Sequence, residues 1–228
     1  MHMRWFTLGV VLAVTGVGCG GSNDEPYKAQ PAYSGRKANM PAVPTLPNNP
    51  IKSGDGYTVY GAIHHLKSRI HSTDVTAKEI AIVGYIVDSN IPTAPPCAVH
   101  PTGKKDPDNC TNIDIPSFWI ADAKGETKGQ KIRVLGWAKN FASVYEAMQK
   151  YKNLKDPPKE LYKDDVWAVD VPFPLPAVGA KVKVTGKYGF TFSKASTGLV
   201  SDPQNGVLTY SKLEVMEPAP EPAAFAKK

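Results

Sequence analysis

Apolar residues occupy both faces of the stretch from Glu79 to Asn90. Ile80, Ile82 and Ile86 share one parity, whereas Ala81, Val83, Tyr85 and Val87 share the other. A strand that is apolar on both faces is covered on both, so we expect this strand at the centre of a closed or sandwiched sheet. Gly84 interrupts it midway, and Gly136 and Gly186 interrupt two later apolar segments. Glycine permits sharp coiling or a bulge, so the pattern predicts a small barrel with corners at these positions.

The remaining periodicity predicts four more strands and two helices. The strands are expected at 117–125, 131–138, 180–193 and 207–217. Apolar residues in a helical stripe from Val59 to Ile70 predict an amphipathic helix within 57–71. Asn140 is a good N-cap for a second helix between the third and fourth strands. Five strands with a helix in that place follow the order of the OB-fold, a five-stranded Greek-key barrel.

The amino-acid sequences of these strands also resemble those of the OB-fold family. The segments are IVGYIVDS, FWIADAKG, IRVLGWA and LPAVGAKVKVTGKYG, and the resemblance covers 79–217. The whole chain looks most like OB-type lipoproteins of Gram-negative bacteria. The resemblance implies a mainly β fold, a five-stranded OB-fold-like Greek-key barrel with one or two flanking helices. We place the domain that contains it at 53–217. Such barrels bind single strands, sugars, peptides and proteins, so the resemblance leaves the ligand open.

Residues 1–18 have the features of an export signal. Arg4 precedes an apolar run that is too short to span a bilayer, and small residues lead to Cys19. The sequence TGVGC resembles the lipobox of bacterial lipoproteins, which implies that Cys19 carries the lipid; an ordinary secretory signal cut nearby is the alternative. Gly20 after the lipid cysteine implies the outer membrane in the sorting pattern of some Gram-negative bacteria. We therefore expect a protein anchored to the cell envelope.

The other two cysteines are Cys97 and Cys110. They lie in a long proline-rich loop after the first strand, which we call the excursion. In an exported protein such a pair is typical of a disulfide. A metal site is the alternative, because Cys97, His100 and Cys110 could be joined by a histidine of the first helix region (His64, His65 or His71). We favour the disulfide and expect neither a metal nor a cofactor.

Two terminal segments lack the apolar content needed for a core. Residues 19–52 are rich in proline and are predicted to form a disordered tether, and residues 218–228 a disordered tail. The domain between them holds 20 Lys and Arg against 17 Asp and Glu from residue 57 to residue 217, an excess of only three. A dedicated nucleic-acid domain concentrates basic charge far more strongly.

Five residues are the candidates for ligand contact. Basic and aromatic side chains interleave on the third and fourth strands, as a single-strand-binding groove requires: Arg133, Trp137, Lys183, Lys187 and Tyr188. A lysine-rich solvated sheet face is the competing interpretation, and Trp137 could equally belong to the core. Asp164, Asp165, Asp170, Ser117 and Ser193 stand in no catalytic motif, so we do not expect an enzyme. The sequence favours binding or scaffolding of a protein or envelope polymer, with extracytoplasmic single-stranded nucleic-acid binding as the alternative.

Overall fold

The computed structural model of the chain describes residues 41–42, 49–67, 78–95, 114–194 and 198–225. Its compact part lies within 47–228, and the described structure there is mainly β, as predicted. The predicted export signal, Cys19 and most of the predicted tether lie outside the described residues, as do Cys97, His100 and Cys110.

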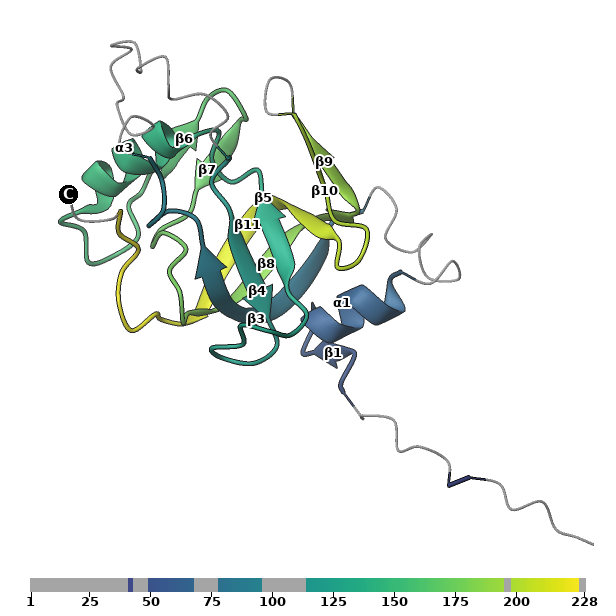
Figure 1. The fold of residues 1–228 in the computed structure, drawn as a ribbon. Helices are drawn as coiled ribbons and strands as arrows, with labels where there is room; N and C mark the ends of the chain where they lie inside the picture. Colours follow the sequence, from purple (N-terminus) through teal and green to yellow (C-terminus); the bar gives the residue numbers. More distant parts are fainter. Residues whose placement is uncertain (1–40, 43–48, 68–77, 96–113, 195–197, 226–228) are drawn as a thin grey trace, which may run out of the picture. The chain divides into compact units, whose positions relative to one another are not determined.

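Five strands form the centre of the sheet, and all five were predicted. They are β3 (Ile80–Ser89), β4 (Phe118–Ala121), β5 (Ile132–Leu135), β8 (Lys181–Gly189) and β11 (Val207–Glu217). The pairing order runs β3-β4-β5-β11-β8, and β8 pairs with β3 again, so the ladder returns to its first strand. Only β5 and β11 are parallel within this cycle. Figure 1 shows these strands curling around one another.

Of the three glycines predicted to mark corners, Gly186 has the closest backbone neighbour, whereas Gly136 lies beyond the end of β5 and faces side chains. Tyr210 pairs with Gly186 and Lys212 with Thr185, so β11 carries an extra residue opposite Gly186. A Cβ on Gly186 would lie 2.1 Å from the backbone oxygen of Thr209, so a side chain there does not fit. This is a β-bulge of the kind that bends a strand.

The N-terminal part of the domain adds two short strands and a helix. β1 (Lys52–Ser53) and β2 (Gly56–Thr58) extend the sheet, with β2 parallel to β3. The helix α1 (Val59–His65) begins at the N-cap Thr58 and ends at the C-cap Leu66; residues 68–71 of the predicted range lie outside the described residues. Asp122, beyond β4, accepts hydrogen bonds from the backbone nitrogens of Val59 and Tyr60, each at 2.7 Å, and thereby anchors the start of α1.

The second helix, α3 (Phe141–Tyr151), begins after Asn140, whose side chain accepts a hydrogen bond from Ser143 N, so the predicted N-cap is confirmed. Two small hairpins were not predicted, although residues 191–193 of the second were predicted as the end of the fourth strand. One pairs β6 (Tyr162–Asp164) with β7 (Val169–Val171), next to α3, and the other pairs β9 (Thr191–Ser193) with β10 (Leu199–Ser201) (Figure 1). Tyr151 ties the first hairpin to α3, because its hydroxyl donates to Val171 O and accepts from Tyr162 N, both at 2.8 Å.

The core lies inside the strand cycle and continues under both helices. Its largest fully buried side chains include Trp137, Phe118, Phe141, Ile82 and Ile86. In β3 the face of Ile80, Ile82 and Ile86 is buried, whereas on the opposite face only Val83 is buried and the other apolar residues are half-buried, so the second face is less fully covered than predicted. None of the helices in the described ranges is long and apolar enough to cross a membrane.

Candidate functional site

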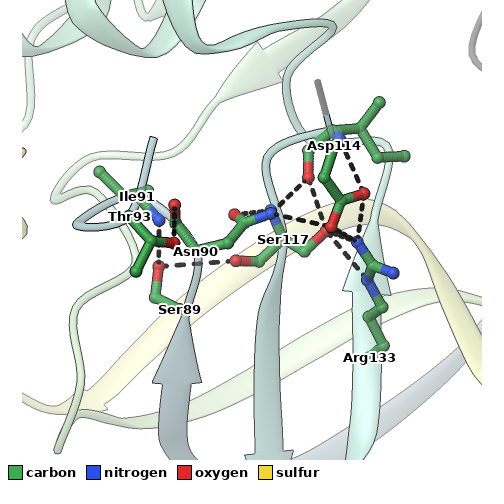
Figure 2. Close-up of polar contacts among 8 residues, drawn as sticks. Ser89, Asn90, Ile91, Thr93, Asp114, Ser117 and Arg133 are labelled. Atoms are coloured by element: carbon green, nitrogen blue, oxygen red, sulfur yellow. Dashed lines mark hydrogen bonds and ion pairs between the residues drawn. The ribbon is translucent and has the colours of Figure 1, made fainter. Parts of the chain in front are cut away.

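Arg133 extends from β5 toward the base of the long excursion between β3 and β4 (Figure 2). Its Nη2 donates to both carboxylate oxygens of Asp114 at 2.7 and 2.6 Å, and its Nε and Nη2 donate to Ser117 Oγ at 3.0 and 2.8 Å. The guanidinium also lies 5.0 Å from the ring centre of Trp119. The predicted ligand contact is therefore already held by neighbouring side chains.

The same cluster fastens the two ends of the excursion together. Asn90, at the end of β3, accepts from Ser117 N and donates to Ile115 O, both at 2.8 Å (Figure 2). Ser117 is fully buried, and its hydroxyl donates to Ile115 O. Because buried polar groups with complete hydrogen bonds hold neighbouring backbone in place, this network is an anchor for the loop base. Cys97 and Cys110, the cysteines of the predicted disulfide, lie outside the described residues.

Trp137, a predicted ligand contact, is fully buried. Its ring lies 6.2 Å from that of Phe118 in the main core, and it offers no surface to a ligand in this structure. The core placement, which the sequence left open as the alternative, is the one observed. Its indole nitrogen, Nε1, is the one buried side-chain polar atom of the described residues without a hydrogen-bond partner.

The three predicted contacts on β8 do not join Arg133 in one site. Lys183 pairs with Asp55 at 2.6 Å, and this contact raises the pKa of the lysine and lowers that of the aspartate. Tyr188 is half-buried, and its hydroxyl donates to Asn205 O at 2.8 Å. Burial raises the pKa of Tyr188. Lys187 is exposed and stands opposite Thr209 on β11.

Other cations on the sheet also have carboxylate partners. Lys131 pairs with Asp88 at 3.1 Å, Lys181 with Glu217 at 3.2 Å, and Lys212 with Glu214 at 3.0 Å. A groove for a nucleic-acid backbone needs positive charge that is available to phosphates. The mixed-charge surface agrees better with the solvated sheet face that was the competing interpretation.

The candidate metal and catalytic groups do not form a site in the described part of the chain. There, no three His, Cys, Asp or Glu side chains lie close enough together to hold an ion. Asp164 is buried, and its carboxylate accepts hydrogen bonds from the backbone nitrogens of Lys139, Val166 and Trp167. It thereby joins the β6–β7 turn to the chain before α3, which is a structural role.

A site that the sequence did not predict lies beside α3. It is an apolar cavity of about 400 Å³ between the end of α3, three central strands, residues 173–177 and the C-terminal segment. The strands contribute Ile86, Val182, Leu213 and Val215, and α3 contributes Met148 and Tyr151. The charged lining residues are Lys152 and Glu221. A second cavity of about 380 Å³ shares residues Pro176, Ala177 and 221–223 with the first, and we call the two together the groove.

Residues 218–228 were predicted to form a disordered tail, but in the structure residues 218–224 line the two cavities and Phe225 follows them. Ala219, Ala223 and Phe225 are half-buried against the main core. The Phe225 ring lies 6.0 Å from that of Tyr145 on α3. We call residues 218–225 the strap. The one sequence signal for its docking was an aromatic residue, Phe225, near the end of an otherwise polar and alanine-rich tail.

Comparison with known proteins adds no identification, because no family model, curated protein or solved structure matches the chain.

Proposed function

We propose that this chain is a lipid-anchored binding protein of the cell envelope, whose groove receives an apolar part of a partner protein. The observation that carries this proposal is the cavity of about 400 Å³ beside α3. Small-molecule and side-chain pockets have volumes of about 300–1,000 Å³ and mainly apolar walls with a few polar groups. The groove has this character, since its charged lining is limited to one lysine and one glutamate.

The strand order supports an OB-type barrel as the scaffold. The cycle β3-β4-β5-β11-β8, with α3 between β5 and β8, agrees with a five-stranded Greek-key barrel. The groove lies on the side of this barrel that α3 covers, rather than on the mixed-charge face around Trp119. On this proposal the barrel is the support, and α3, residues 173–177 and the strap form the contact surface.

The location in the envelope rests on the N-terminal sequence. Residues 1–18 and Cys19 support export and lipidation, and Gly20 supports the outer membrane as the destination. A lipid on Cys19 and the tether after it would hold the domain near a membrane surface. Binding fits the site better than catalysis, because the described carboxylates singled out by the sequence are structural or solvated rather than gathered in the groove.

A photo-crosslinker in place of Leu154 tests this function. Leu154 lines the groove and is 41% exposed, so a benzophenone side chain fits there without disturbing the core. The control position is Ala123, an exposed residue outside both cavities. In native envelopes we expect a protein adduct from position 154 only, and we expect Ala223→Trp, which fills the groove, to remove it. Equal adducts at both positions, or an adduct unaffected by Ala223→Trp, would refute the proposal.

A further inference from the structure

We infer that the groove recognises an extended, proline-rich segment of its partner, and that this segment displaces the strap. The inference rests on the proposed function and names the class of ligand for the same groove. It comes from what the groove already holds, since residues 218–225, PAPEPAAF, are themselves such a segment.

The strap lies in the groove as a separate peptide would. Proline has a fixed φ and no backbone N–H, so a segment with prolines at 218, 220 and 222 favours an extended conformation and cannot continue the β11 ladder. The side chains of Ala219, Ala223 and Phe225 are half-buried against the core, and the three prolines, although more exposed, line the two cavities.

Two aromatic side chains, Tyr151 and Phe173, stand in the wall of the groove. The ring of Phe173 meets that of Tyr151 edge-on at 5.0 Å, and Pro174 and Pro176 follow in the same wall. Aromatic-lined grooves dock extended proline-rich chains because these chains lose little conformational freedom on binding. Gly179 allows the close approach, since a Cβ there would lie 2.8 Å from Cδ of Pro220.

The strap fills this groove incompletely, which is why a partner could replace it. Its inward residues 219 and 223 are alanines, and the cavities of about 400 and 380 Å³ remain beside them. Larger apolar side chains at these two positions would bury more apolar surface, and each buried methylene strengthens binding. The preferred ligand is therefore a proline-rich segment with large apolar residues four positions apart.

The first experiment measures binding to the full chain by fluorescence anisotropy. The probe is a labelled peptide of residues 218–225 that carries Ala219→Leu and Ala223→Leu, and the unsubstituted peptide is its control. In the protein, Ala219→Asp with Ala223→Asp places carboxylates against the apolar wall and releases the strap. We expect this variant to bind the leucine peptide at least ten-fold more tightly than the unchanged chain does, and at least ten-fold more tightly than it binds the control peptide.

The second experiment does not depend on releasing the strap. Ala219→Leu with Ala223→Leu in the full chain fills the cavities from within, so we expect a higher melting temperature and loss of peptide binding. Ala123→Leu, outside the groove, should change neither. A folded strap-released variant that ignores both peptides overturns the inference, and so does a leucine variant with an unchanged melting temperature. Binding of dodecanoate without peptide binding also overturns it, while the groove would remain a ligand site.

Discussion

Replacing Trp137 by alanine separates a ligand contact from a core residue. If Trp137 bound a ligand at the surface, the change would remove binding and leave the melting temperature nearly unaltered. The structure predicts the opposite, because the side chain is fully buried beside Phe118 and belongs to the main core. The groove does not include Trp137, so ligand binding by the folded variant should be retained.

The size of the effect follows from two opposing contributions. An aromatic side chain buries about 150–250 Å², which at about 25 cal/mol per Å² is worth about 4–6 kcal/mol. Against this, Nε1 of Trp137 is buried without a hydrogen-bond partner among the described residues. Removing an unpaired buried donor removes its desolvation penalty, which offsets about 1–3 kcal/mol of the loss in the free energy of unfolding. We therefore expect Trp137→Ala to lower the free energy of unfolding by about 3 kcal/mol, at the low end for such truncations.

Thermal and urea unfolding followed by circular dichroism measure this loss. For a domain of about 150–250 residues each kcal/mol lowers the melting temperature by about 2–4 °C, so a fall of about 6–12 °C is expected. Trp137→Phe is the matched control, because it keeps an aromatic ring and removes the unpaired N–H, and it should cost clearly less. A melting temperature within about 2 °C of the unchanged protein for Trp137→Ala would refute the core placement.

Four further predictions follow. Asp122→Ala should lower the free energy of unfolding by about 1–2 kcal/mol in urea titrations, because it removes both hydrogen bonds that anchor the start of α1, whereas Asp122→Asn keeps one acceptor and should lose less. Burial raises the pKa of Tyr188 and of Tyr210 above the unfolded value of about 10. The stability that their neutral forms support is thus complete below about pH 10 and is lost as the pH rises further; Tyr188→Phe should flatten this alkaline decline, and an identical decline in the variant would contradict the assignment. Single-stranded DNA should bind weakly in anisotropy titrations, since Lys131, Arg133, Lys181 and Lys183 are paired with carboxylates; a tight complex that weakens by about a thousand-fold between about 50 and 200 mM salt would instead support the nucleic-acid alternative. The intact mass of membrane-extracted protein should show acyl groups on a chain that begins at Cys19 and a loss of two hydrogen atoms from a Cys97–Cys110 disulfide, and an unmodified mass would remove both expectations.

The central strands could be predicted from the sequence because buried strand positions give a regular pattern of apolar residues. In β3 the alternating residues Ile80, Ile82 and Ile86 predict a buried face, and the structure buries all three; the opposite face, also apolar, is only partly buried. Gly186 likewise indicates a close approach of two backbones, since a Cβ at this position would overlap the backbone oxygen of Thr209. The N-cap Asn140 is similarly local, since its hydrogen bond reaches only three residues along the chain.

The candidate site could not be predicted from local patterns of this kind. A polar or aromatic residue on a strand carries no sign of its partner, so Arg133 looked available although Asp114 and Ser117 hold it. The parity of Trp137 with Lys131 and Arg133 suggested a surface position, but the strand β5 ends at Leu135, and after Gly136 the chain directs Trp137 into the core. Alternation predicts a face only while the strand continues.

The sequence by itself determined the mainly β architecture, the five central strands and the capped helix α3, because each depends on periodicity or on contacts within a few residues. Tertiary structure alone decided where the groove lies. Its walls come from α3, β3, β8, β11 and residues 173–177, and its occupant comes from the end of the chain. Alanines in a proline-rich tail give no local sign of burial, because the apolar surface that they contact is formed by distant segments of the chain. No pattern within the tail itself therefore predicts that it docks there.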